Sequence, residues 1–222
     1  MREYYDAQLK DLNNQIIEMG SLVEKSVAYS AKSLVEADIE KINKVANYES
    51  AINRKEKEIE SLCVNLIMHN QPVAKDLRFI SAVLKMVTDL ERIGDHAEDI
   101  AEIARFVNSQ EHQLDKKVFS EIAKTAVDMV NLGVDAFVKR DLDLAQKVAE
   151  MDNTVDRLFV EIRERLVAGL KSGEYESAPA LDLFLATKYF ERIGDHAVNI
   201  AEWVIYSLTG KLENLDDFGI EI

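Results

Sequence analysis

The sequence predicts an all-α protein made of two tandem, pseudo-symmetric three-helix bundles of long antiparallel helices. Its 222 residues include only 8 Gly and 2 Pro, so long helices need few interruptions. The string ERIGDHA occurs at residues 91–97 and again at 191–197, a recurrence that chance does not explain. This duplication predicts two similar units, residues 1–108 and 109–222.

The first unit is expected to contain three helices. Apolar or small residues recur every three or four positions from Leu9, which predicts an amphipathic helix that ends near Ala37. Asp38 is a candidate N-cap for a second helix that continues to the break at 69–72. Proline causes this break because it lacks an amide donor and restricts the residue before it. A third helix over about 73–107 then carries the first ERIGDHA string.

The second unit repeats this order. A polar linker at 108–113 leads to a helix from about Leu114 to Lys139, a turn at 140–141 and a helix to about Lys171. The last helix should begin near Pro179.

The two copies differ in the length of one connection. Pairing Glu49 with Asp152 gives an offset of 103, whereas pairing Glu91 with Glu191 gives 100. The connection before the last helix is therefore three residues shorter in the second copy. Such variation is typical of a loop between duplicated helices.

The charge and the cysteine content limit the function classes. Lys and Arg total 27 against 41 Asp and Glu, and the net charge of -14 disfavours nucleic-acid binding and favours cations or basic protein surfaces as partners. Cys63 is the one cysteine, and the first residues lack the apolar core of a signal peptide, so we expect a cytoplasmic protein. No apolar run approaches the roughly 20 residues that cross a bilayer, so we expect no direct membrane insertion.

Carboxylates form a stripe on the third helix of each unit. At about 100° per residue, Glu91, Asp95 and Asp99 share one narrow face with Glu98 and Glu102, opposite the apolar residues. The simplest interpretation is a solvated helix face. However, like charges four residues apart destabilise a helix by about 0.2 to 0.5 kcal/mol per pair. The pair Glu91 and Asp95 nevertheless recurs in the second copy as Glu191 and Asp195. Something should compensate the repulsion.

The middle helices carry a comparable element of oxygen-bearing side chains four residues apart. If two neighbouring helices bring these elements together, four or more oxygen ligands converge, as Mg, Mn, Ca or Fe prefer. Bridging carboxylates can also hold two ions about 3.5 to 4 Å apart. The two sites should be similar but unequal, because Asp99 is replaced by Asn199 and Asn53 by Asp156. The predicted metal ligands are Glu49, Asn53, Glu91, Asp95, Asp99, Asp152, Asp156, Glu191, Asp195 and Asn199.

No catalytic apparatus is recognisable in the sequence. It contains no Gly-rich phosphate loop, nucleophile elbow or CxxC motif, and no Glu-x-x-His spacing of a ferritin-type di-iron site. We therefore predict no catalytic residues and no enzyme activity. His96 and His196 fall between the acidic stripe and the core, where a packed histidine is more common than a ligand.

The duplicated string, the Gln71–Pro72 junction, the Asp76–Arg78 sequence and the Met19–Gly20 pair resemble the PhoU family of phosphate-uptake regulators. The resemblance covers essentially the whole chain. It implies a cytoplasmic accessory protein of the phosphate ABC transporter that damps uptake. It also implies that the protein helps a sensor histidine kinase to repress phosphate-starvation genes.

The resemblance further implies a homodimer that binds multinuclear clusters of iron or zinc on the outer bundle surface, with Mg and Mn left open. Two alternatives remain. One is a helical adaptor whose acidic faces only keep it soluble and bind no metal. The other is a hydrolase that uses a carboxylate-held pair of ions, which would require metal-dependent turnover of a phosphoester.

Overall fold

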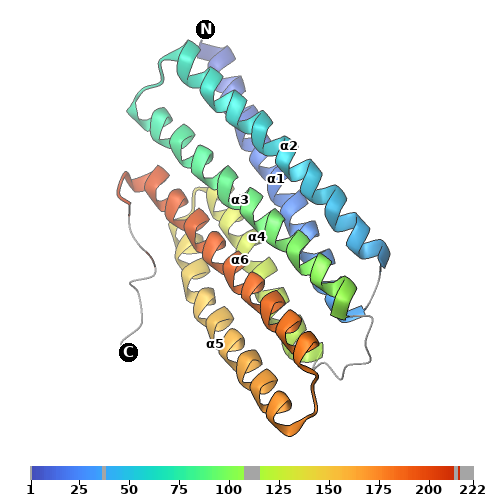
Figure 1. Cartoon of the computed structure of the whole chain (residues 1–222). Coiled ribbons are helices and arrows are strands. Elements are labelled where there is room, and N and C mark those ends of the chain that lie inside the picture. The colour runs from blue at the N-terminus through green and yellow to red at the C-terminus, as the bar shows by residue number, and fades with distance from the viewer. Residues whose placement is uncertain (1, 37–38, 108–115, 213–214, 216–222) are drawn as a thin grey trace.

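The computed structural model describes residues 2–36, 39–107, 116–212 and 215 (Figure 1). Within these residues the chain forms long α-helices and no strand, which confirms the predicted fold class. None of the described helices combines the length and apolar character that a bilayer crossing requires. The helices are α1 (Arg2–Glu36), α2 (Ile39–Asn70), α3 (Ala74–Val107), α4 (Lys116–Lys139), α5 (Leu142–Ser172) and α6 (Ser177–Thr209).

The observed helix boundaries agree with the predicted ones to within about two residues in the described parts of the chain. Gln71 adopts a positive φ of 44° directly before Pro72, and α3 begins two residues later. The Oδ1 atom of Asp141 accepts hydrogen bonds from the amides of Asp143 and Leu144, at 3.0 and 3.1 Å, and so caps α5. The predicted cap Asp38, the linker at 108–113 and the helix start at Leu114 lie outside the described residues.

The two repeats share one core. α1, α2 and α3 form one bundle and α4, α5 and α6 the other, yet α3 and α6 make the most extensive helix pairing in the described chain. α1 packs in addition against α4, and buried side chains of both repeats belong to a single apolar cluster. One broad face of the molecule therefore consists of α2, α3, α6 and α5, with α1 and α4 packed behind them (Figure 1).

The apolar and small residues of the ERIGDHA string build this core. Ile93 and Ile193 are fully buried, and Gly94 lies where a Cβ atom would come within 3.0 Å of the Cδ1 atom of Ile52. Gly194 is equally constrained, because a Cβ atom there would lie 2.9 Å from Oδ1 of Asp152. A glycine at this position lets the third helix of each repeat approach the middle helix closely.

We expect Gly94→Val to lower the free energy of unfolding by about 1 to 3 kcal/mol, because the added methyl groups overpack the contact with Ile52. Urea denaturation followed by circular dichroism measures the change. Ala168→Val on the exposed surface of α5 serves as the control and should change stability by no more than about 0.5 kcal/mol. Equal losses in the two variants would contradict the close-packing role of Gly94.

Candidate functional site

Acidic side chains of α2 and α3 converge in the first repeat. We call Glu49, Glu56, Glu91, Asp95 and Glu98 acidic cluster 1. Burial raises the pKa of Glu91, and the neighbouring charges of Asp95, Glu56 and Glu49 raise it further. Burial also raises the pKa of Glu98, followed by the charges of Glu49, Glu102 and Asp95. Carboxylates of α2 and α3 thus repel one another.

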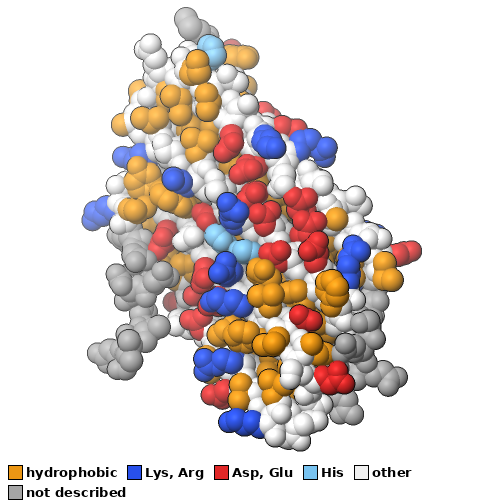
Figure 2. All heavy atoms as spheres, viewed as in Figure 1, with side chains coloured by type: hydrophobic (Ala, Val, Ile, Leu, Met, Phe, Trp, Pro, Cys, Tyr) orange, Lys and Arg blue, Asp and Glu red, His pale blue; other side chains and the backbone are white. Residues whose placement is uncertain are grey.

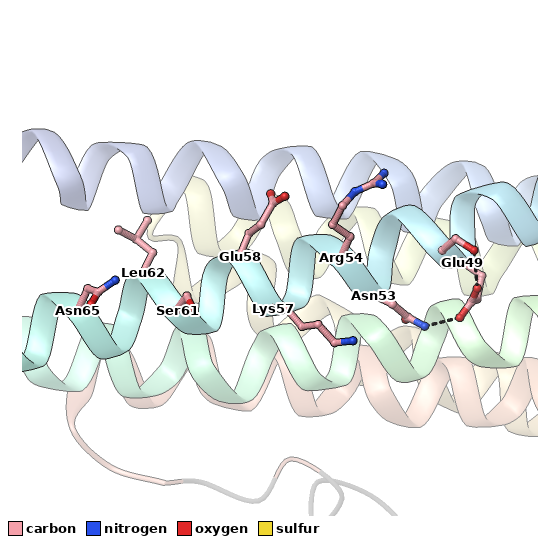
Figure 3. Close-up of a pocket in the computed structure, with 9 residues that line it drawn as sticks. Glu49, Asn53, Arg54, Lys57, Glu58, Ser61, Leu62 and Asn65 are labelled. Carbon is pink, nitrogen blue, oxygen red and sulfur yellow. Dashed lines mark hydrogen bonds between the residues drawn. The ribbon is translucent and has the colours of Figure 1, made fainter.

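Asn53 lies beside Glu49 on α2. Its Nδ2 atom donates a hydrogen bond to Oε1 of Glu49, whereas its Oδ1 atom is buried without a hydrogen-bond partner in the described chain. Figure 3 shows this pair at one end of an open hollow of about 920 Å³ along α2, with Asn53 and Lys57 directed toward α3. Glu49, the member of acidic cluster 1 that lines the hollow, is therefore accessible from solvent.

Arg92 compensates part of the repulsion. Its Nε atom lies 3.6 Å from Oε2 of Glu91, and its Nη1 atom lies 3.4 Å from Oδ2 of Asp95. The Arg92 side chain is 57% exposed, so these ion pairs contribute little. Most of the cost of gathering the carboxylates remains.

The second repeat holds a corresponding group. We call Asp152, Asp156, Glu191 and Asp195 acidic cluster 2. Although Asp195 keeps exposed surface, burial of its carboxyl group and the charges of Glu191 and Asp156 raise its pKa to about 6. Glu191 accepts a charged hydrogen bond from Lys188 through Oε1, while Oε2 is buried without a hydrogen-bond partner among the described residues.

Two predicted ligands lie elsewhere. Asp99 hydrogen-bonds with Tyr189 and lies 3.6 Å from Nδ1 of His96, so it faces α6 instead of α2. Asn199 donates a hydrogen bond from Nδ2 to Oδ1 of Asp89 on α3, at 3.1 Å. The structure therefore places Asp99 and Asn199 at the contact between the repeats. Glu98, which was predicted on the acidic stripe but not as a ligand, lies near Glu49.

The repeated histidines join the two halves. His196 Nδ1 lies 2.9 Å from Oδ1 of Asp89, and the ring of His96 lies 5.3 Å from that of Tyr189. The two histidine rings lie 5.5 Å apart. Burial lowers the pKa of His96 to about 4, with a further contribution from His196. Both histidines are packed residues of the repeat interface, which we call the histidine contact.

Asp89 and Tyr189 were not among the residues predicted from the sequence. They occupy equivalent positions, each seven residues before its histidine, so each shares a helix face with that histidine. This seven-residue spacing could have linked Asp89 and Tyr189 to the histidines. It does not identify their contacts, because each residue contacts the histidine of the other repeat. Figure 2 shows histidines at the centre of the face, beside acidic side chains gathered over α2 and α3.

The donor atoms suit a hard or borderline cation. Within the described chain, no three His, Cys, Asp or Glu side chains form a preassembled metal site, so the clusters would hold an ion only after side-chain rotation. The buried Oδ1 atom of Asn53, beside acidic cluster 1, and the buried Oε2 atom of Glu191, in acidic cluster 2, are nevertheless oxygen acceptors without a donor among the described residues. Carboxylate and amide oxygens of this kind fit Mg, Mn, Fe or Zn.

We expect Asp89→Ala to lower the free energy of unfolding by about 1 to 3 kcal/mol, because it removes the acceptor for His196 and Asn199 at the repeat interface. Urea denaturation provides the measurement. Asp128→Ala on the exposed surface of α4 makes the same change in helix propensity and should not destabilise the protein. Indistinguishable effects of the two changes would show that Asp89 does not tie the repeats together.

The raised pKa of Asp195 predicts a pH dependence in metal-free protein. The folded state binds more protons than the unfolded state between about pH 4 and pH 6, so this group reduces stability as the pH rises through that window. Asp195→Asn should therefore match the parent near pH 4 and exceed it at pH 7. The gain is about 1 kcal/mol or less, because solvent screens an exposed group.

Denaturation at both pH values in the presence of EDTA measures this difference. Asp128→Asn controls for the loss of one exposed charge. A variant that is less stable than the parent at pH 7 would contradict the repulsion assigned to acidic cluster 2.

The chain is similar to known proteins along almost its whole length. A family profile described as PhoU domain matches residues 16–104 and again 119–204. A relative from Clostridium acetobutylicum, named phosphate-specific transport system accessory protein PhoU homolog, is 34% identical over 97% of this chain and 99% of its own. A relative of the same name from Pseudomonas aeruginosa is 36% identical over 94% of this chain and 86% of its own.

Solved structures agree with this assignment. The crystal structure of PhoU from Pseudomonas aeruginosa superposes with a TM-score of 0.89 at 36% identity, covering 93% of this chain and all of that one. The phosphate transport system regulatory protein PhoU from Streptococcus pneumoniae gives a TM-score of 0.86 at 26% identity, covering 95% and 99%. Sequence, duplication and fold together show that the chain belongs to the PhoU family.

Proposed function

We propose that this protein is a negative regulator of phosphate uptake and of phosphate-starvation signalling. It acts in the cytoplasm by metal-dependent or metal-stabilised binding to the phosphate ABC transporter and its sensor histidine kinase, and it forms a homodimer. The observation that carries the proposal is the pair of carboxylate clusters at corresponding positions of the two repeats. The names of the relatives, which refer to accessory proteins of phosphate-specific transport, support the transporter as the partner.

Repulsion within the clusters supports a role for metal. Burial and neighbouring charges raise the pKa values of Glu91, Glu98 and Asp195, so the ionised form of these carboxylates is disfavoured in both clusters. A bound cation would supply the positive charge that neutralises them. The residues that would hold it are Glu49, Asn53, Glu91, Asp95 and Glu98 in the first repeat and Asp152, Asp156, Glu191 and Asp195 in the second.

The arrangement of the repeats supports a docking role. Acidic cluster 1 lies on α2 and α3 and acidic cluster 2 on α5 and α6, and these four helices lie side by side with α3 packed against α6 (Figure 1). Metal loading would change the charge of this face at two related places. A partner that binds both halves would then sense the loaded state.

A metal-free adaptor is the second candidate. It is favoured by the absence of a preassembled metal group among the described residues. In that case, purified protein without metal would bind its partner equally well in the presence of a chelator.

Metal binding is tested by replacing one carboxylate pair at a time. Glu91→Gln/Asp95→Asn and Glu191→Gln/Asp195→Asn should each remove the metal of one repeat, and the four-site variant should remove nearly all of it. Elemental analysis after loading with Fe or Zn measures the stoichiometry. Exposed residues outside the clusters, replaced as Glu121→Gln/Asp128→Asn, provide the matched control. Unchanged stoichiometry in the four-site variant would refute the assignment.

Regulation is tested by capture of the transporter and the kinase at high and low phosphate, with bound metal measured in the same samples. We expect capture to be stronger at high phosphate and to weaken in the four-site variant. Capture that is independent of metal and of these residues would favour the adaptor. Loss of the metal without loss of capture would separate the metal site from the regulatory function.

A further inference from the structure

The two repeats differ at exposed positions where their backbones correspond. In the second repeat, Val160 on α5 is 40% exposed, and Leu181 and Leu185 on α6 are 62% and 44% exposed. The offsets of 103 and 100 place polar or charged residues at the equivalent positions of the first repeat. These residues are Lys57, Ser81 and Lys85.

The exposed apolar side chains are not needed to form the bundle. The first repeat forms the same three-helix arrangement with polar residues at these positions, and most buried positions of α3 recur at the equivalent positions of α6. Exposed apolar clusters on soluble proteins commonly mark interaction sites. The second repeat therefore carries a surface with a use other than folding.

This surface spans two helices. We call its exposed residues Val160, Val167, Leu181, Phe184 and Leu185 the repeat-2 patch. Phe184 stacks against the half-buried Phe159 of α5 with ring centroids 5.8 Å apart, which joins the two sides. Figure 2 shows hydrophobic side chains gathered over the lower half of the face, where α5 and the first half of α6 lie.

We propose that the repeat-2 patch docks an amphipathic helix of a partner protein, one with an apolar stripe and basic residues at one end. The seam between two packed helices accepts a third helix whose apolar residues recur at i, i+3, i+4 and i+7. Beyond the patch, the same seam continues into acidic cluster 2, and the whole chain carries a charge of -14. A cationic end on the partner complements that part of the seam.

The charges along the seam also set the direction of the partner. Lys188 lies between the patch and the cluster, but it is paired with Glu191 and packs over the ring of Phe159. Arg163 is exposed on α5 near the patch, so the basic end of the partner should lie over the cluster instead. From Leu181 to Asp195 the seam is about 21 Å long at 1.5 Å per residue, so a helix of about 15 to 18 residues covers both parts.

This inference concerns the metal-free protein, in which acidic cluster 2 keeps its negative charge, and it rests on the proposed function only for the identity of the partner. The test needs neither metal nor transporter. The full chain in EDTA is titrated into two fluorescent 18-residue helical peptides that share one Leu stripe. One peptide carries four Lys residues at one end, and the other carries four Glu residues at the same positions. Fluorescence anisotropy gives Kd for each.

We expect the Lys peptide to bind at least 10-fold more tightly than the Glu peptide. The variant Val160→Gln/Leu181→Ser/Leu185→Gln leaves the net charge unchanged and should weaken binding at least 10-fold. The control Val64→Gln/Met68→Gln changes exposed apolar residues of α2 and should leave Kd within 2-fold. Asp156→Asn/Asp195→Asn should weaken the Lys peptide alone, by about 3-fold or more. Circular dichroism of each variant verifies that the bundle is intact.

Equal binding of the two peptides, or a patch variant that binds like the parent, overturns the proposal. So does a homodimer in light scattering that the patch variant converts to a monomer, because a second copy would then cover the patch. Binding to anionic vesicles that is lost in the patch variant, with neither peptide bound, would assign the surface to a membrane and also overturn it. None of these outcomes alters the metal stoichiometry or the transporter capture that test the proposed function.

Discussion

The packing of α3 against α6 is the constraint on which the rest of the structure depends. It buries Ile93, Ile193 and their apolar neighbours in one core, and it brings Asp89 within hydrogen-bond distance of His196 in the other repeat. With this contact fixed, the middle helices α2 and α5 lie on the two flanks. The acidic clusters consequently lie on one face, and the duplication becomes a paired surface instead of two independent modules.

Within each repeat, close packing and charge repulsion act against each other. Gly94 and Gly194 let the third helix approach the middle helix, which brings carboxylates of both helices together and partly removes them from water. Arg92 and Lys188 offset a part of this repulsion through exposed or half-exposed ion pairs. A protein that needed only stability would not gather these groups twice, and this cost is the physical reason for assigning the clusters a ligand.

The sequence predicted the fold more completely than the site, and particular residues show why. Helical periodicity, the Gln71–Pro72 junction and the duplicated string give the helices and their order, because each depends on local geometry. A helical wheel places Asp99 on the acidic stripe, yet it does not indicate which neighbouring helix faces that edge. The contact of Asp99 with Tyr189 depends on how the repeats pack, which no local pattern encodes. For the same reason the sequence did not reveal Asp89.

The central claim is that both repeats hold cations in their carboxylate clusters on the face of α2, α3, α6 and α5. Anomalous diffraction from crystals of the full chain grown with Fe or Zn tests it most directly, because it locates each ion without relying on activity. We predict one group of peaks beside Glu49 and Glu91 and a second beside Asp152 and Glu191, related by the symmetry of the repeats. Peaks confined to other surfaces, or none at either cluster at full metal loading, would contradict the claim.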